Sequence, residues 1–343
     1  MATVYWEWLT IIQLCLGILG IVGNLLVIVV YISKKKRQNT TNTLILALAL
    51  TDLFTSINII PWPTDWHGAV PLTALGRLYC GVIFPKFFMW TSIMASVGLL
   101  TILSVERYLA VCRPLWYRTV FSKTRPWHFI VAIWVFAAVE KSFNLYCTVP
   151  TPSGNCEFIV PGNGGFQIFL AVGVFTVEYM VPLLVMLVTY VKTIQALKRQ
   201  ARNLLEQIDS RNNPAFSLLQ TRRKVIEMLL LVIVAFSICW GPLQFAFLIG
   251  SLGIKGDYFL STLQDAFIVL AFFNSCANPI IYTFKNKSFR NSLRDRFRLR
   301  RKWNAVSSVT GTATEPGNKE SHVQRTVRPV DRPLAIEDLP EIG

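Results

Sequence analysis

The sequence predicts an all-α fold: a bundle of seven transmembrane helices, with a short amphipathic eighth helix on the cytoplasmic side. Three observations predict it. Hydrophobic residues make up 53% of the 343-residue chain and charged residues only 15%, which is too little charge to cover a soluble domain of this size. Seven apolar segments are each long enough to cross a bilayer, which takes about 20 residues. Basic residues gather on alternate sides of these segments, as membrane topology requires.

The seven apolar segments occupy residues 9–32, 44–63, 79–112, 127–146, 166–191, 226–252 and 259–284. No Lys or Arg precedes the first segment, whereas a run of basic residues, 34–37, follows it. Because basic residues mark the cytoplasmic side, the N-terminus is predicted to lie outside. The loops after the third and fifth segments are also basic, and the opposite loops hold little beyond Arg77, Lys86 and Lys255. The C-terminus is therefore expected inside.

This pattern divides the chain into a short extracellular N-terminus (1–8), the seven-span bundle (9–284), an amphipathic helix along the inner membrane surface (285–303) and a disordered cytoplasmic tail (304–343). The amphipathic helix is predicted because Phe289, Leu293 and Phe297 recur every four residues among arginines. A solvated basic segment is the alternative. The tail is rich in Ser, Thr, Pro, Glu and Arg and has little apolar periodicity.

Composition and spacing argue against several other classes of protein. The formal charge of +15 is spread between apolar segments, so it indicates topology and contact with acidic lipids of the bilayer rather than a nucleic-acid partner. The cysteines form no C-x-x-C pair and the histidines are far apart, so neither a metal cluster nor a catalytic triad is predicted. We expect no enzyme and no resident cofactor. A transporter or channel is the alternative, although no internal inverted repeat is seen.

Several polar residues lie at membrane depth, where they are costly and by default functional. Asp52 lies in the middle of the second segment, with no Lys or Arg at its depth. The other polar residues inside the segments are Asn24, Ser96, Asn274, Ser275 and Asn278. Together they would hold water or a small cation, and the alternative is isolated side chains that bond to their own backbones. Interior prolines at Pro182, Pro242 and Pro279 are expected to bend the last three helices.

With these features, the chain resembles a class A, rhodopsin-like G-protein-coupled receptor over residues 9–302. The motifs that carry the resemblance are, in chain order, Gly23-Asn24, Leu48-Ala49-Leu50-Thr51-Asp52, Glu106-Arg107-Tyr108, Trp134, Pro182 with Tyr190, Phe236 with Cys239-Trp240-Gly241-Pro242, and Asn278-Pro279-Ile280-Ile281-Tyr282. Each motif alone is weak. Their order on seven consistently oriented segments is specific.

The resemblance implies roles for residues along the path to the cytoplasm. Arg107 would pair with Glu106 at rest and reach a heterotrimeric G protein in the active state. The implied residues for G-protein coupling and the activation switch are Glu106, Arg107, Tyr108, Leu115, Tyr190, Asn278, Pro279 and Tyr282. The implied connector between ligand pocket and cytoplasm is Val97, Pro182, Phe236, Trp240 and Pro242. Arrestin and receptor kinases are further implied partners, at the tail.

A sodium site and a disulfide bond are also implied by the resemblance. The sodium ligands would be Asp52, Ser96, Asn274, Ser275 and Asn278, with the ion acting as an allosteric modulator. The disulfide would join Cys80 to Cys156, with Cys147 as the rival partner. Cys80 lies two residues further from Arg107 than is usual in the family, and Pro85 intervenes. A local irregularity is therefore expected between Cys80 and the rest of the third helix.

One departure from the family concerns the restraint on Arg107. An acid at the base of the sixth helix often holds this arginine, and Arg222 stands at the matching position here. Two like charges repel, so we expect measurable signalling without ligand. The alternative is that Glu227, further along the same helix, takes over the restraint.

The ligand class follows partly by elimination within the family. Amine receptors carry an aspartate where this chain has Met89, and opsins carry a lysine where it has Phe272. The expected pocket residues are Trp62, Lys86, Met89, Trp90, Glu178, Tyr179 and Trp240. Aromatic rings with charges of both signs suit a peptide or another polar organic ligand, and a lipid is the alternative. Glu140 and Lys141 either join this pocket or form a structural pair. The receptor is expected in the plasma membrane.

Overall fold

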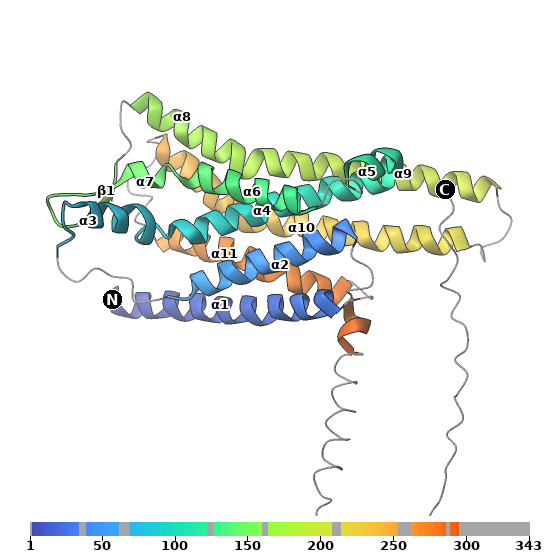
Figure 1. Cartoon of the computed structure of the whole chain (residues 1–343), viewed down its shortest axis with the longest axis horizontal. Coiled ribbons are helices and arrows are strands. Elements are labelled where there is room, and N and C mark those ends of the chain that lie inside the picture. Colours follow the sequence, from blue (N-terminus) through green and yellow to red (C-terminus); the bar gives the residue numbers. More distant parts are fainter. Residues whose placement is uncertain are drawn as a thin grey trace, which may run out of the picture. The chain divides into compact units, whose positions relative to one another are not determined.

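The computed structural model describes residues 2–33, 39–61, 69–121, 126–159, 164–207, 214–252, 262–285 and 289–294, and the part up to Arg294 forms one compact unit (Figure 1). The elements are α1 (Ala2–Ser33), α2 (Thr40–Ile59), α3 (Ala74–Leu78), the π-helix η1 (Tyr79–Ile83), α4 (Phe87–Cys112), α5 (Pro114–Val120), α6 (Pro126–Lys141), α7 (Asn144–Cys147), β1 (Thr148–Pro150), β2 (Cys156–Phe158), α8 (Gly164–Phe175), the π-helix η2 (Thr176–Met180), α9 (Val181–Gln207), α10 (Pro214–Ser251) and α11 (Thr262–Lys285). The predicted all-α class is confirmed, with one small hairpin added.

Within the described residues, seven helical stretches are long and apolar enough to cross a membrane, as predicted. They are Trp8–Ile32, Thr40–Ile59, Ala74–Cys112, Pro126–Cys147, Gly164–Asn203, Ile226–Ser251 and Leu263–Lys285. Three helices run well beyond their apolar segments: α1 begins at Ala2, α9 ends at Gln207 and α10 begins at Pro214. The reason is that an apolar pattern locates the bilayer, whereas a helix satisfies its own backbone hydrogen bonds and continues into water.

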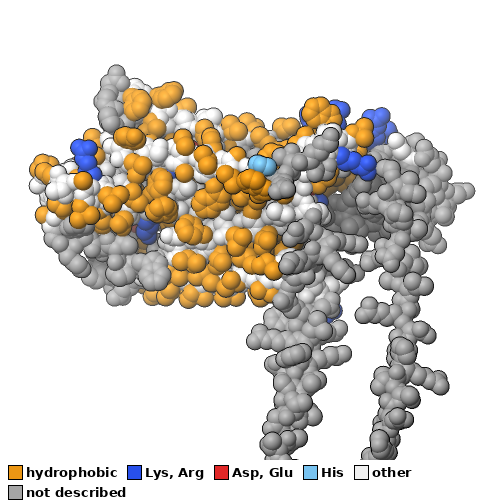
Figure 2. Space-filling view, viewed as in Figure 1, with side chains coloured by type: hydrophobic (Ala, Val, Ile, Leu, Met, Phe, Trp, Pro, Cys, Tyr) orange, Lys and Arg blue, Asp and Glu red, His pale blue; other side chains and the backbone are white. Residues whose placement is uncertain are grey.

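The third span, α4, lies at the centre of the bundle. It packs against α2, α6 and α9, while α1 packs against α2 and α11, and α10 packs against α9 and α11. Large side chains such as Leu100, Phe236 and Trp240 are almost fully buried between these helices. Figure 2 shows hydrophobic side chains over much of the described surface in that view, with Lys and Arg near the ends of the bundle. An apolar belt of this kind is what a bilayer requires.

The expected irregularity beyond Cys80 is confirmed. The chain leaves α3 in the π-helix η1, makes a turn at residues 84–86, and enters α4 from Lys86, whose φ of 52° lies in the left-handed region. Pro85 has no N–H to donate and its ring crowds the preceding turn, which favours a break in the helix at this position. A π-helical turn holds an extra residue. These two features accommodate the long spacing from Cys80 to Arg107.

Cys80 forms its disulfide bond with Cys156, the first residue of β2, and the two Cα atoms are 5.4 Å apart. The rival, Cys147, is a buried free thiol at the end of α7. Strands β1 and β2 pair antiparallel, with Val149 opposite Glu157. The disulfide therefore ties this hairpin to the start of the third span. We call this end of the bundle the Cys80 end, and the opposite end the Arg107 end.

A second π-helix, η2, interrupts the fifth span immediately before α9. Pro182 cannot donate a backbone hydrogen bond to the carbonyl of Glu178, so the regular α pattern fails there. Glu178 and Tyr179 lie within η2, and both are buried. The proline expected to bend this span thus coincides with a local widening of the helix, which turns two polar side chains toward the core.

Residues 289–294 are helical after the seventh span. Phe289 is only 1% exposed and stacks on Tyr31 of α1, with ring centroids 6.4 Å apart. Arg290 donates from Nη1 to the carbonyl oxygen of Phe284 at 2.6 Å. The first turns of the predicted amphipathic helix are therefore present and packed on the bundle, while residues 295–303 and the tail at 304–343 lie outside the described residues.

Candidate functional site

The Arg107 end is organised around Glu106, whose side chain is buried. Its Oε1 accepts hydrogen bonds from Thr41 Oγ1 at 2.7 Å and from the Tyr117 hydroxyl at 3.0 Å. Its Oε2 lies 3.2 Å from Nε of Arg107, whose side chain is 27% exposed. One carboxylate thus joins α2, α4 and α5 and leaves the arginine accessible from the end of the bundle.

Tyr117 was missed from the sequence. It lies on the short helix α5, which begins at Pro114, a residue favoured in the first turn of a helix. Two residues earlier, Leu115 is 76% exposed. Burial and the neighbouring Glu106 carboxylate raise the pKa of Tyr117, so its hydroxyl stays protonated and continues to donate. The sequence offered one hint of this role, which is that Tyr117 lies between Leu115 and Phe121 in a short segment predicted to follow the third span.

The tyrosines predicted to take part in the activation switch differ in how deeply they are buried. Tyr282 is 2% exposed, and its hydroxyl has no hydrogen-bond partner among the described residues. Tyr108 and Tyr190 are half-buried. The side chain of Arg222 lies outside the description, although its backbone belongs to α10. The expected repulsion between Arg222 and Arg107 therefore stays a prediction.

Asp52 lies midway along the bundle and is completely buried. Its Oδ1 accepts from Ser96 Oγ at 2.6 Å, and its Oδ2 accepts from Asn278 Nδ2 at 2.9 Å. Asn274 and Ser275 are also buried on α11, and the backbone oxygen of Ser275 accepts from Asn24 Nδ2 at 3.2 Å. A buried carboxylate surrounded by neutral hydroxyl and amide groups fits a hard cation such as sodium, which prefers oxygen ligands.

Three of the five predicted connector residues share one core. Val97, Phe236 and Trp240 are each 1% exposed or less and belong to the same hydrophobic cluster. Phe236 stacks on Tyr179, with ring centroids 5.7 Å apart. Pro242 and Pro279 lie inside α10 and α11, both of which continue through them. Pro279 also packs against Gly23, where any side chain would collide with its ring.

A cavity of about 290 Å³ lies toward the Cys80 end, between the third, fourth, fifth, sixth and seventh spans. It is lined by Pro85, Trp90, Lys141, Phe143, Asn144, Val174, Glu178, Trp240, Leu243, Gln244, Ala246, Phe247, Gln264 and Ile268. Of the predicted pocket residues, Trp90, Glu178 and Trp240 line it. Met89 and Tyr179 are buried but are not in its wall, and neither is Lys86. Trp62 lies outside the described residues.

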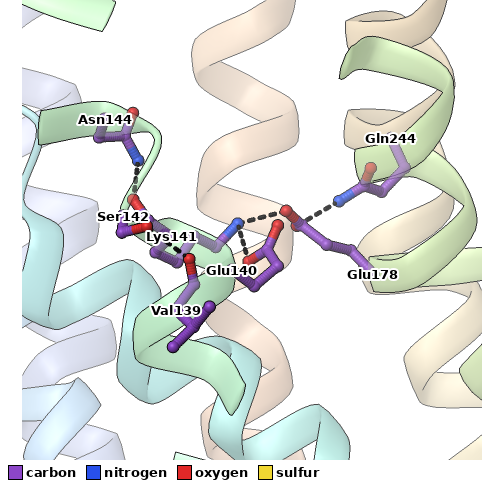
Figure 3. Close-up of polar contacts among 7 residues, drawn as sticks. All are labelled: Val139, Glu140, Lys141, Ser142, Asn144, Glu178 and Gln244. Carbon is purple, nitrogen blue, oxygen red and sulfur yellow. Dashed lines mark hydrogen bonds and ion pairs between the residues drawn. The ribbon is translucent and has the colours of Figure 1, made fainter. Parts of the chain in front are cut away.

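Lys141 is the centre of a buried ionic cluster on the cavity wall (Figure 3). Its ammonium group contacts the Glu178 carboxylate and lies 3.4 Å from Oε2 of Glu140. Gln244 donates from Nε2 to Oε2 of Glu178 at 2.9 Å. The Glu140–Lys141 pair is thus one part of a larger cluster that joins three spans. Gln244 was missed, although it follows Trp240 by four residues and therefore lies on the same helix face.

These features define a class of protein: a seven-span membrane protein with a largely apolar cavity that carries an ion pair at one end, a buried carboxylate at mid-depth, and an accessible arginine at the other end. The sequence model described as "7 transmembrane receptor (rhodopsin family)" matches residues 23–282. The chain therefore belongs to the rhodopsin family of seven-transmembrane, G-protein-coupled receptors. This is a family of receptors rather than enzymes, and membership decides against the transporter alternative.

Similar proteins include receptors for chemically different ligands. The chain is 30% identical to the galanin receptor 2b of Danio rerio over 93% of its own length and 86% of that protein. It is 29% identical to the allatostatin-A receptor of Bombyx mori over 81% of its length and 76% of the relative. It is also 31% identical to the melatonin receptor type 1A of Ovis aries, over 81% and 74% respectively. These identities leave the ligand subfamily unassigned.

Proposed function

We propose that the protein resides in the plasma membrane with its N-terminus outside, binds an extracellular peptide or another polar organic ligand in the cavity, and activates a heterotrimeric G protein. The observation that carries this proposal is the position of Trp240. Its ring lines the cavity and is also part of the buried core that contains Val97 and Phe236. A ligand that displaces this ring therefore acts on the helices that hold the Arg107 end.

The polarity of the cavity supports the proposed ligand class. An ion pair, two glutamine side chains and Asn144 face a volume otherwise walled by aromatic and aliphatic groups, the composition typical of sites for organic ligands. Peptide receptors among the relatives point the same way. A lipid ligand is the alternative, and it is less suited because an acyl chain would leave Lys141, Glu178 and Gln244 facing hydrocarbon.

On the cytoplasmic side, Arg107 binds the G protein after its contact with Glu106 opens, and Leu115 docks beside it. Tyr108, Tyr190 and Tyr282 take part in the same rearrangement. Sodium at Asp52, Ser96, Asn274, Ser275 and Asn278 favours the resting state. Arrestin and receptor kinases act on the tail at 304–343, which lies outside the described residues.

A cell-based screen tests this proposal. Cells that express the receptor with a G-protein reporter are exposed to panels of extracellular peptides, small polar organic molecules and lipids, with Arg107→Ala as the signalling-dead control. We expect a hit from the first two panels that signals through the parent and not through the control. A hit only from the lipid panel, or signals that persist in Arg107→Ala, would contradict the proposal.

A further inference from the structure

The ionic cluster on the cavity wall is not electrically balanced. Two carboxylates, Glu140 and Glu178, share the single ammonium of Lys141. The side chain of Glu178 is 4% exposed, that of Lys141 7% and that of Glu140 12%. Lys141 and Glu178 are the charged residues among the described ones that line the cavity. With all three groups ionised, the cluster carries one negative charge in a poorly solvated place, where such a charge is costly.

The same wall has unused hydrogen-bond acceptors. Gln244 is only 4% exposed, and its Nε2 is committed to Glu178, which fixes the orientation of the amide. Its Oε1 has no partner among the described residues, and neither does Oε1 of Gln264. A carboxylate oxygen accepts more than one hydrogen bond, so Glu178 also retains acceptor capacity. The cavity wall thus presents unpartnered acceptor oxygens beside a cluster in which two carboxylates share one ammonium.

We propose that the ligand fills this cavity with an organic cation, an ammonium or a guanidinium group, which is held by the Glu178 carboxylate and the side-chain oxygens of Gln244 and Gln264. This inference rests on the proposed function, because it takes the cavity to be the ligand site. The carboxylate anchor comes from Glu178 of the fifth span. At the third-span position where amine receptors carry an aspartate, this chain has Met89.

The charge count favours a cation over an anion. An anionic ligand at Lys141 would place a third negative group around one ammonium. A cationic ligand would instead give two cationic groups for the two carboxylates. A guanidinium offers five N–H donors in a fixed plane and an ammonium offers three, which matches a wall of acceptors. The indole N–H of Trp240 is a donor without a partner among the described residues, so it suits an acceptor atom elsewhere on the ligand.

The test uses small probes on the full-length receptor in lipid nanodiscs, with binding measured by thermal stabilisation and by NMR saturation transfer. Benzamidine and benzylamine carry the cation, benzamide is the neutral counterpart and benzoate the anion. N-acetyl-argininamide and its citrulline analogue repeat the comparison with a peptide-like source. We expect the cationic probe of each set to bind in preference to its neutral or anionic counterpart. If N-acetyl-argininamide binds more tightly than benzamidine, the cation is assigned to a peptide ligand.

Two variants remove the surplus charge and one serves as the matched control. Glu140→Gln leaves the contact between Lys141 and Glu178 intact, so it keeps the fold while removing the charge. We expect it and Glu178→Gln to weaken benzamidine binding at least about tenfold, which corresponds to about 1.4 kcal/mol. Glu157→Gln makes the same change on the exposed strand β2, outside the cavity, and should have no effect.

Preferential binding of benzoate, absence of benzamidine binding at millimolar concentration, or an equal loss in Glu157→Gln would overturn the proposal. Basal nucleotide exchange on a purified G protein is measured on the same samples. Exchange that depends on Arg107 without benzamidine binding removes the cation site and leaves the proposed receptor function in place. Benzamidine binding with no exchange that depends on Arg107 supports the cation site and contradicts the proposed function.

Discussion

The two ends of the bundle differ in how the chain builds them. At the Arg107 end, α4 continues as a regular helix to Cys112, and Glu106 and Arg107 are neighbours in one short motif. At the Cys80 end, the same span is broken into α3, η1, a turn and α4, and its contacts come from residues far apart in sequence. Glu106 and Arg107 are therefore brought together by local sequence, whereas the residues of the cavity are brought together by tertiary structure. Four substitutions sharpen this contrast.

The largest effect is expected from Arg107→Ala. Because Arg107 is the accessible member of the pair with Glu106, its loss should reduce G-protein nucleotide exchange to the level seen without receptor. Surface expression and benzamidine binding should be unchanged. Arg113→Ala, an exposed basic residue at the same end, is the matched control. Exchange that survives in Arg107→Ala, or that is lost equally in Arg113→Ala, would mean that a general basic surface drives coupling.

Next in size is the loss of the disulfide at the Cys80 end. Cys156→Ser opens a bridge between residues 76 apart in sequence, and a disulfide bond typically contributes about 2–4 kcal/mol to stability. We expect a clear fall in Tm and weaker benzamidine binding, because the hairpin loses its tie to the third span. Cys147→Ser is the control for a buried cysteine that forms no bridge. A fall in Tm at least as large in the control would point to packing rather than the bridge.

The middle of the bundle is tested by Asp52→Asn. Sodium should lower basal exchange by the parent about fivefold relative to choline, within the usual range of allosteric coupling. The asparagine variant removes the charge that attracts the ion and should respond equally to both salts. Parent exchange that is the same in sodium and choline would count against a sodium site at Asp52, Ser96 and Asn278.

The smallest effect is expected at Tyr117. Its hydroxyl donates to Glu106 at 3.0 Å, and a hydrogen bond to a charged group is worth about 1.5 kcal/mol or more when buried. Tyr117 is only partly buried, so Tyr117→Phe should raise basal exchange roughly threefold by freeing Arg107 and its partner. Tyr146→Phe makes the same change on an exposed residue of α7 and should do nothing. Unchanged exchange in Tyr117→Phe would leave Thr41 and Arg107 as the important contacts of Glu106.

Much of the fold was predictable from sequence, for a specific reason. Hydropathy reports directly on the bilayer, so all seven spans were found, and the helix ends differ most where α1, α9 and α10 extend beyond the apolar pattern. The contacts of Asp52 with Ser96 and Asn278 were anticipated because polar residues in apolar helices stand out. The periodicity of the sequence could not reveal that Lys141 of the fourth span contacts Glu178 of the fifth span. It also could not reveal that Gln244 of the sixth span donates a hydrogen bond to Glu178. These contacts depend on how η2 rotates the fifth span.

The break between Cys80 and α4 has a consequence for the phase of the third span. Each residue added to a continuous α-helix rotates everything beyond it by about 100° and shifts it by about 1.5 Å. Two extra residues in an unbroken helix would rotate Ser96 and Arg107 by about 200° relative to Cys80. Ser96 would then point away from Asp52, and Arg107 would point away from the interior of the bundle. The π-helix η1 and the turn at Pro85 take up that rotation before Phe87. Chain length at the Cys80 end can therefore change while every side chain beyond the turn keeps its direction.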